Sequence, residues 1–192
     1  MKKIITVVLC LISVFMVVGC GKKSDENYVA PNSKEAQEKS TKKSNCTVFE
    51  CLKKIKPEST VEQINKIIGF EGKLTNEKYN EYTWEFSNTE SLTATYYSSD
   101  KATIDTKYNR DSLKNKKVDL TKYSEIQSAL KSGSSLTYDE FKSKVGGVDG
   151  TLTYMSSSSN KYIWVNKNGE YLIGTFSNTT NKCTFIIGQI RK

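Results

Sequence analysis

The chain contains an internal repeat that spans most of its length. Residues 60–74 read TVEQINKIIGFEGKL, and residues 137–152 read TYDEFKSKVGGVDGTL. Further matches follow at offsets that drift only from 77 to 80: Tyr82-x-Trp84 with Tyr162-x-Trp164, and residues 92–96 with 172–176. Each copy has helix-like and then strand-like content, which predicts a small α+β unit duplicated in tandem. This organisation favours an extended shared surface over a single catalytic pocket.

The predicted fold class is therefore α+β, with a helix-loop-helix and a four-stranded antiparallel sheet in each copy. The first repeat is expected over 46–108, a polar linker over 109–122 and the second repeat over 123–192. Ser59 or Thr60 caps the second predicted helix, which ends at Gly69, and Thr137 caps its counterpart. Strands are predicted at 72–78, 81–87, 91–98, 101–108, 150–156, 161–167, 170–177 and 182–190. Each half alone buries little surface, so we expect both to share one larger sheet.

The N-terminus has the features of an exported lipoprotein. Met1-Lys2-Lys3 is followed by a 15-residue run of apolar and small residues, too short to span a bilayer comfortably. The segment ending in Cys20 resembles the bacterial lipobox, which implies a signal peptide over 1–19 and a lipid on the Cys20 sulfur. The alternative is an ordinary secretory signal with an incidental cysteine. Residues 20–45 are then the lipidated cysteine and a disordered tether, because they contain almost nothing to bury.

Composition limits the setting and the partners. There are 27 Lys and two Arg, and the formal net charge is +8. Abundant Lys, Asn, Ile and Tyr suggest an AT-rich, low-GC Gram-positive source, which would place the anchor on the outer face of the plasma membrane. Nucleic acid is disfavoured as a partner, because there is no arginine cluster or recognised motif and the export signal removes the opportunity.

The sequence offers little support for catalysis. The chain has no histidine, the commonest general base and metal ligand. It also lacks a nucleophile elbow, a phosphate-binding glycine loop and paired metal-ligand spacing. We therefore expect no enzyme activity, no metal and no cofactor.

The hairpins predict which side chains share a face of the sheet. Asn168-Gly169 is a strong two-residue turn signal, and it would pair Trp164 with Ile173. Opposed residues point to the same face, so an aromatic face opposite the helices is expected. Its predicted members, carried to the first copy by the repeat, are Tyr82, Trp84, Tyr97, Tyr162, Trp164 and Tyr171. The alternative is that the two Tyr-x-Trp motifs belong to the core.

The cysteines leave alternatives open. A four-residue turn at 178–181 would place Cys183 opposite Phe176, on the helix side. There it is either a small buried residue or half of a disulfide to Cys46 or Cys51. Cys46 and Cys51 are not expected to bridge each other if both are helical, because side chains five apart leave the same face.

The layout resembles the β-lactamase inhibitor protein fold and small Gram-positive lipoprotein domains that share it. The resemblance rests on the helix-ending Gly69 and Gly146, the Tyr-x-Trp strand and the Leu-x-x-Thr-aromatic strand. It implies a concave sheet whose aromatic face grips a protein, with a hairpin carboxylate as a loop contact, here Glu90. Inhibition of a β-lactamase is not predicted as the main function, since this match depends on one residue.

The expected function is a lipid-anchored, non-catalytic module of the cell envelope that binds or inhibits a protein partner. The membrane is engaged through Cys20 alone. The alternative is an envelope structural or assembly lipoprotein without a single tight target. An exposed, contiguous aromatic sheet face would favour the first function.

Overall fold

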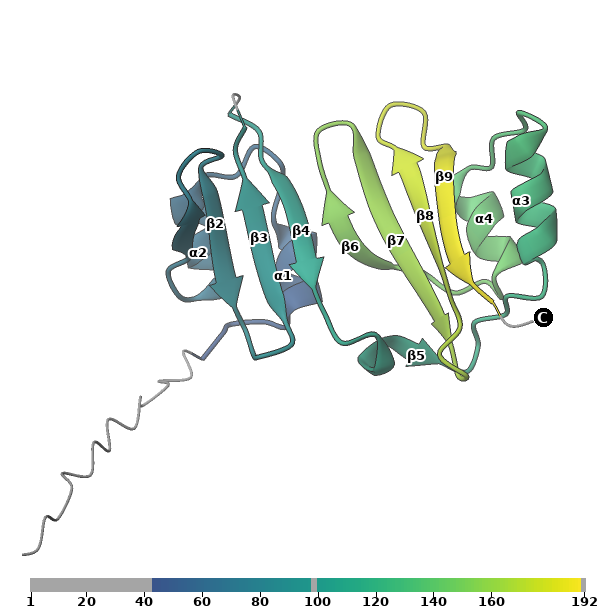
Figure 1. Cartoon of the computed structure of the whole chain (residues 1–192), viewed down its shortest axis with the longest axis horizontal. Coiled ribbons are helices and arrows are strands. Elements are labelled where there is room, and N and C mark those ends of the chain that lie inside the picture. The colour runs from purple at the N-terminus through teal and green to yellow at the C-terminus, as the bar shows by residue number, and fades with distance from the viewer. Residues whose placement is uncertain (1–42, 98–99, 191–192) are drawn as a thin grey trace, which may run out of the picture. The chain divides into compact units, whose positions relative to one another are not determined.

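The structure of the chain is a computed structural model, and it describes residues 43–97 and 100–190. The predicted signal peptide, Cys20 and most of the predicted tether lie outside these residues. Within the described part, no helix is both long and apolar enough to cross a membrane. The fold is α+β, with four α-helices, one 3₁₀ helix and a nine-stranded, mostly antiparallel sheet (Figure 1).

Two helices precede a run of strands twice along the chain. The first run is α1 (Val48–Lys54), α2 (Val61–Ile68), β1 (Lys73–Asn76), β2 (Glu81–Glu85), β3 (Ser91–Thr95) and β4 (Thr103–Lys107). The connection contains η1 (Arg110–Leu113) and β5 (Lys114–Asn115). The second run is α3 (Tyr123–Lys131), α4 (Tyr138–Lys144), β6 (Thr151–Met155), β7 (Ser159–Asn166), β8 (Tyr171–Ser177) and β9 (Cys183–Gln189).

Local capping chemistry sets where three of the helices begin. Three threonine side chains each accept a hydrogen bond from the backbone N–H three residues later: Thr47, Thr60 and Thr137. In return, the side-chain oxygen of that later residue accepts a hydrogen bond from the backbone N–H of the threonine. This capping box satisfies two amide groups that the first helical turn leaves without partners. Thr60, and not Ser59, caps α2. Gly69 ends that helix in the left-handed region, at φ +97°, where glycine is favoured.

The sheet has the strand order β1-β2-β3-β4-β6-β7-β8-β9. The two runs of strands join where β4 pairs with β6, through Ile104 with Met155 and Asp105 with Tyr154. The expectation of purely antiparallel pairing is wrong at one place, because β5 of the predicted linker pairs parallel to β7. The β6 register on β7 ends at Ile163, which leaves the edge of the last β7 residues open to β5.

The predicted hairpin register is wrong by one residue. Asn166 and Glu170 flank a three-residue loop, with the Asn166 amide donating to the Glu170 carbonyl at 2.9 Å. The Gly169 amide donates to the Asn166 carbonyl at 3.0 Å, and Gly169 has φ +81°. This is the pattern of a tight turn followed by a left-handed glycine. It pairs Trp164 with Leu172 instead of Ile173, so the side chains of the two strands are redistributed between the faces.

The hairpin of the first run shows the same displacement. The Phe86 amide donates to the Glu90 carbonyl at 2.9 Å, so residues 87–89 form a three-residue loop and not a two-residue turn. Trp84 is consequently paired with Leu92. The prediction for Cys183 is confirmed, because it pairs with Phe176.

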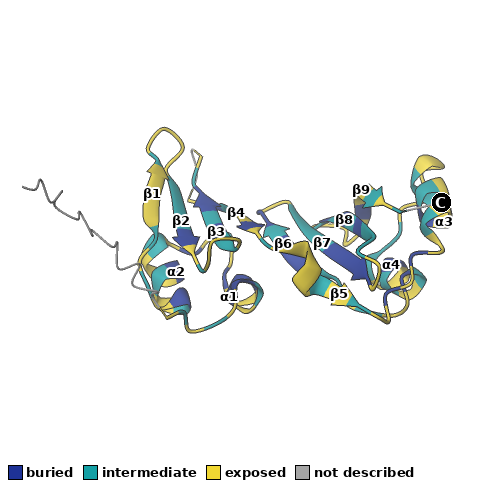
Figure 2. Ribbon diagram, turned by 60° about the horizontal axis from the view of Figure 1, so that its bottom comes forward, coloured by how far each residue is buried: buried dark blue, intermediate teal, exposed yellow. Residues whose placement is uncertain are grey.

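Two hydrophobic cores lie between strands and helices, and each contains one of the two tryptophans. The first core joins α1 and α2 to strand residues that include Trp84, Leu92 and Ile104. Leu152 and Met155 of β6 also belong to this core, although they follow the second pair of helices in sequence. The second core joins α3 and α4 to residues that include Trp164, Leu172 and Phe176. Strand side chains that lie between these core residues in sequence point to the opposite side of the sheet, which we call the outer face. Figure 1 shows α1 and α2 behind β2–β4, and Figure 2 shows the buried segments of the strands.

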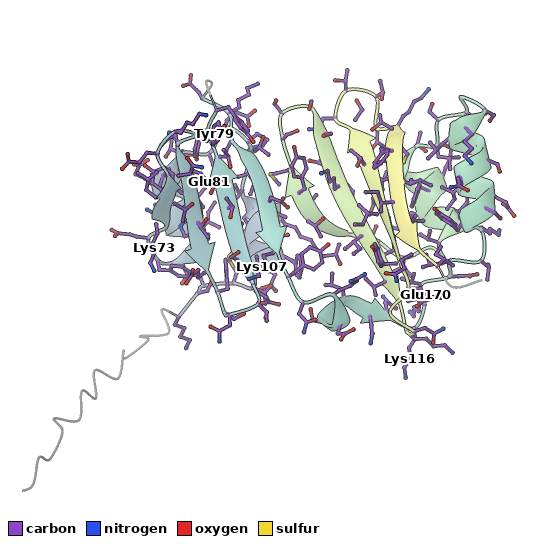
Figure 3. The ribbon with its side chains drawn as sticks, viewed as in Figure 1. Lys73, Tyr79, Glu81, Lys107, Lys116 and Glu170 are labelled. Carbon is purple, nitrogen blue, oxygen red and sulfur yellow. A yellow bond between two sulfur atoms is a disulfide. The ribbon has the colours of Figure 1, made fainter. Side chains whose placement is uncertain are left out.

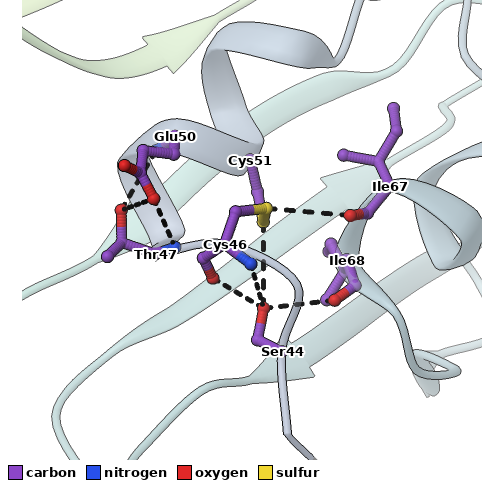
Figure 4. The surroundings of a disulfide bond; sticks show 7 residues. All are labelled: Ser44, Cys46, Thr47, Glu50, Cys51, Ile67 and Ile68. Atoms are coloured by element: carbon purple, nitrogen blue, oxygen red, sulfur yellow. Dashed lines mark hydrogen bonds between the residues drawn. A yellow bond between two sulfur atoms is a disulfide. The ribbon is translucent and has the colours of Figure 1, made fainter.

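A disulfide closes the segment in front of α1. Cys46 and Cys51 are bonded, with their Cα atoms 5.6 Å apart (Figure 4). The bridge was expected to be impossible only if both cysteines were helical, and this condition is not met, because only Cys51 is helical while Cys46 precedes the Thr47 cap. The Ser44 hydroxyl donates to the Cys46 carbonyl at 2.6 Å and lies 3.1 Å from the Ile68 carbonyl, which ties the segment to the end of α2. Cys183 is a free, buried thiol.

Candidate binding surface

The six aromatic residues predicted to form one binding face do not lie on one face. Trp84 and Trp164 belong to the two cores, and Tyr82 and Tyr162 pack against the same cores from their margins. Tyr97 and Tyr171 are on the outer face. The observed register of each hairpin differs by one residue from the predicted one. This difference reverses the side chains of β2 and β7 relative to the neighbouring strands, so the two tryptophans face the helices and not the outer face.

Both tryptophans are core residues, so the prediction that they form an exposed binding face is wrong. Trp84 is 0% exposed and Trp164 is 1% exposed. The Trp84 indole N–H donates to the Asn65 side-chain oxygen at 2.8 Å, and that of Trp164 donates to the Val148 carbonyl at 2.8 Å. A buried indole needs such a partner. The alternative reading of the Tyr-x-Trp motifs as core is therefore the correct one for the tryptophans.

Glycines make room for both indoles. A side-chain carbon on Gly72 would come within 2.5 Å of the Trp84 ring, and one on Gly150 would come within 2.7 Å of the Trp164 ring. The backbone passes directly over each indole at these two positions, in the segment that follows the second helix of each run.

Tyr82 and Tyr162 are half-buried on the helix side. The Tyr82 ring lies 6.4 Å from that of Trp84, and the Tyr162 ring lies 4.8 Å from that of Tyr138. Tyr162 packs against both cores, which gives it a structural role at the junction between the two runs. Neither residue lies on the outer face.

The outer face of the second run is apolar and exposed. Phe185 is 57% exposed and Ile187 is 49% exposed, both on β9, the edge strand. Ile187 pairs with Ile173, and Tyr171 lies two residues before Ile173 on the same side of β8. We call Tyr171, Ile173, Phe185 and Ile187 the outer apolar patch. Soluble proteins rarely expose contiguous apolar side chains without a function.

A β-bulge places Phe185 in this patch. Cys183 pairs with Phe176 on the helix side, and a regular strand would put Phe185 on that side too. The register shifts between Thr175 and Phe176, so that Phe185 instead pairs with Thr175 and points outward. Sequence reasoning missed Phe185 and Ile187 for this reason. The apolar run Phe185-Ile186-Ile187 at the end of the chain was the available signal.

A pocket of about 450 Å³ adjoins the patch. Its lining includes Tyr108, Ile163, Tyr171 and Ile173, together with Arg110 from η1. The centre of the Arg110 guanidinium lies 4.2 Å from the centre of the Tyr171 ring, a stacked cation–π contact. None of the four ion pairs found among the described residues uses Arg110. Arg110 was assigned to the polar linker from the sequence, and its proximity to Tyr171 depends on the β5–β7 pairing.

Arg110 also lines a second pocket, of about 260 Å³, together with Asp111, Lys114, Glu170 and Gln189. Its guanidinium is thus shared by one pocket that has apolar walls at Ile163 and Ile173 and by a second pocket that is polar. Arginine offers a planar set of N–H donors that matches a carboxylate in a bidentate manner, and it remains charged at any physiological pH. The arrangement can therefore hold an apolar side chain and an acidic group at neighbouring positions.

Glu90, the predicted loop contact, lies in the β2–β3 hairpin and is half-buried. Its carbonyl accepts hydrogen bonds from the Phe86 and Ser87 amides, which fix the loop. A role for its carboxylate in binding a partner stays a prediction.

Burial controls the ionisation of several titratable side chains among the described residues. No group of three or more His, Cys, Asp or Glu side chains is placed to hold a metal ion in residues 43–97 and 100–190. Burial raises the pKa of the Cys183 thiol to about 11, which keeps it protonated and unreactive at neutral pH. Burial likewise raises the pKa of Tyr138 to about 12.

Comparisons with known proteins give no match: no family model, no curated protein and no solved structure is similar to this chain.

Proposed function

We propose that this protein is a lipid-anchored, non-catalytic module of the cell envelope that binds a protein partner through the outer apolar patch. The observation that carries the proposal is the pair of exposed residues Phe185 and Ile187 beside the Arg110–Tyr171 stack. Aromatic and arginine side chains dominate the binding energy of protein interfaces, usually at the centre of an apolar area. The contact surface differs from the predicted tryptophan face, but the class of function is the same.

The partner is proposed to present an acidic side chain next to an apolar one. Ile163 and Ile173 line the pocket beside Arg110 and would receive the apolar group. The Arg110 guanidinium would pair with the carboxylate while its other face remains on Tyr171. A partner of this composition also complements the basic charge of the whole chain.

The proposal includes the tandem duplication, the arrangement of helices on one face, and the resemblance to the β-lactamase inhibitor protein fold. The repeated order of two helices and four strands supports it, as do the capped second helices at Thr60 and Thr137. The resemblance extends to the architecture only, because the proposed contact surface lies in the second run and does not use Glu90 or the tryptophans.

Site-specific photo-crosslinking in the native cell envelope tests the binding surface. A photoreactive residue at position 185 or 187 is expected to give a discrete crosslinked product, and one at the exposed Ser143 of α4 is expected to give none. Arg110→Ala should reduce the product at position 187 by about 30-fold, which corresponds to the loss of about 2 kcal/mol expected for a hot-spot residue. Equal crosslinking from positions 187 and 143, or no product from 185 and 187, would refute the patch as the contact surface.

The lipid anchor is tested separately. Cys20→Ala is expected to release the protein into the medium or to leave it unprocessed, because the apolar run before Cys20 is removed with the signal peptide. Fractionation of cells expressing wild type and variant measures this. A Cys20→Ala variant that has lost residues 1–19 and still associates with the membrane as firmly as wild type would refute lipidation at Cys20.

A further inference from the structure

The outer face of the first run differs in chemistry from the outer apolar patch. Nine side chains on β2, β3 and β4 form three rows of three, fixed by the pairing register. The rows are Glu81–Thr95–Thr103, Thr83–Thr93–Asp105 and Glu85–Ser91–Lys107. None of the nine is apolar: five carry a hydroxyl, three carry a carboxylate and Lys107 carries an ammonium group. We call this set the hydroxyl grid.

Hydrogen bonds between side chains hold the grid in order. The Thr83 and Thr93 hydroxyls are 3.1 Å apart, and the Thr75 hydroxyl continues the line at 3.2 Å from Thr83. The Thr75 and Thr95 hydroxyls donate to the two carboxylate oxygens of Glu81 at 2.9 and 3.4 Å. A pre-ordered array loses little conformational entropy when a ligand binds to it. Figure 3 labels Glu81 and Lys107, which mark two ends of this face.

A shallow pocket of about 570 Å³ lies over the grid. Its lining includes Glu81, Thr93, Asp105 and Lys107, and it is bounded by Tyr97 and Tyr154. Tyr97 is 63% exposed and contacts the Tyr79 ring edge-on at 5.9 Å. Tyr154 pairs with Asp105 across the β4–β6 junction and has the Lys161 ammonium 4.2 Å from its ring centre. The pocket therefore combines hydroxyls and carboxylates with aromatic rings at its border.

The charges and polarity of the pocket exclude most classes of ligand. A protein interface needs an apolar centre, and the grid offers none. An anion is disfavoured, because the carboxylates of Glu81 and Asp105 line the pocket against the ammonium of Lys107, while the Lys161 ammonium lies at the border on the Tyr154 ring. A metal ion is disfavoured by the absence of a three-ligand cluster in the described part of the chain. A hydroxyl-rich ligand without negative charge satisfies all of these conditions.

We propose that the hydroxyl grid is a binding site for an oligosaccharide that carries no negative charge. Sugar hydroxyls donate to the carboxylates of Glu81 and Asp105 and exchange hydrogen bonds with the threonine hydroxyls. The apolar C–H face of a sugar ring stacks on the exposed Tyr97 ring. Strands about 4.8 Å apart and rows about 7 Å apart give the grid a size of roughly 10 by 14 Å, enough for two to three linked sugar rings.

Asp105 is expected to decide whether cationic or neutral oligosaccharides bind more tightly. Its carboxylate accepts the Thr106 amide at 2.8 Å, and burial raises its pKa despite that bond and the nearby Lys161. Asp105 and Glu81 are the two carboxylates that line the pocket, so a cationic group on the ligand can pair with either of them. Amino sugars with a free ammonium are therefore expected to bind more tightly than their neutral N-acetylated forms.

Calorimetric titration of the full-length chain in mild detergent tests the proposal. The probes are the β-1,4 tetramers of N-acetylglucosamine and of glucosamine, with tetragalacturonate as the anionic control. The two amino-sugar tetramers are expected to bind with a Kd of about 1 mM or tighter, and the anionic tetramer at least ten-fold more weakly. NMR amide shifts should map to β2, β3 and β4. No binding of either amino-sugar tetramer, equal binding of the anionic one, or shifts confined to β8 and β9 would overturn the site.

Matched variants separate this site from the proposed protein-binding patch. Thr93→Val keeps the shape of the side chain and removes its hydroxyl, and Tyr97→Ala removes the stacking ring. Each is expected to weaken sugar binding at least five-fold, while Phe185→Ala leaves it unchanged. Asp105→Asn should abolish the preference for the cationic tetramer without abolishing binding of the neutral one. Wild-type affinity in both Thr93→Val and Tyr97→Ala would refute the proposal, whatever the outcome of the crosslinking at positions 185 and 187.

Discussion

The burial of two tryptophans shows that they serve the core and not an exposed binding face. Trp84 and Trp164 are almost wholly buried, and each indole has a hydrogen-bond acceptor. We therefore expect Trp84→Ala and Trp164→Ala each to lower the free energy of unfolding by about 3–5 kcal/mol, through lost burial and the cavity left behind. Urea denaturation measures this. Tyr97→Ala is the control, since an exposed ring should change stability by less than about 1 kcal/mol. Tryptophan variants as stable as this control would contradict the core assignment.

Cys183 provides a second test at the residue scale. Its folded-state pKa is about 11, above the ordinary value of 9.0, because burial disfavours the thiolate. The contribution of Cys183 to stability is then fully present below pH 9 and is lost as the pH rises towards 11, since the unfolded thiol ionises first. We expect the stability difference between wild type and Cys183→Ala to shrink across this range. A difference that stays constant from pH 8 to 11 would contradict it.

At the same scale, Cys183 should react slowly with an aromatic disulfide reagent at pH 8 in the folded protein and rapidly in urea. The Cys46–Cys51 disulfide leaves Cys183 as the free thiol among the described residues, and the assay uses the double variant Cys10→Ala/Cys20→Ala, which removes both cysteines of the N-terminal segment. Rapid reaction of the folded protein would show that the thiol is accessible.

Among the elements, α1 depends on a covalent link that the other helices lack. The Cys46–Cys51 disulfide closes a loop with a sequence separation of five, for which the chain-entropy relation gives about 2 kcal/mol of stabilisation. Cys46→Ser is expected to lower the free energy of unfolding by that amount, and reduction of the wild type should have the same effect. Cys46→Ser under reducing conditions is the control, because it has no disulfide left to lose. An unchanged midpoint on reducing the wild type would contradict a stabilising role.

For the whole molecule, the two cores are expected to unfold together. Met155 and Leu152 of β6 complete the first core, and Tyr162 of β7 packs against both. The chain contains one tryptophan in each core, so Trp84→Phe and Trp164→Phe leave a single fluorescent reporter of one core. Within each variant, fluorescence and far-ultraviolet circular dichroism should give coincident denaturation curves, as for a two-state transition. Separate midpoints would show that the two runs of elements are independent folding units.

The local elements were predictable from the sequence. Thr60, Gly69 and Thr137 cap or end helices as predicted. The reason is that capping and helical periodicity involve residues three or four apart, which adjacent sequence displays. The eight long strands were also located to within a few residues, and the turn before Cys183 placed that thiol on the correct side.

Tertiary structure decided which face each strand residue occupies, and with it the candidate site. A three-residue loop in place of a two-residue turn at Gly169 moved Trp164 into the core, and a bulge turned Phe185 outward. Each is a displacement of one residue, which reverses side-chain direction in a strand but hardly alters its local sequence signal. The contact of Arg110 with Tyr171 has no local signal at all, because it depends on the pairing of a linker strand with β7. The sequence by itself therefore determined the elements and their order, whereas the composition of each surface depended on long-range pairing.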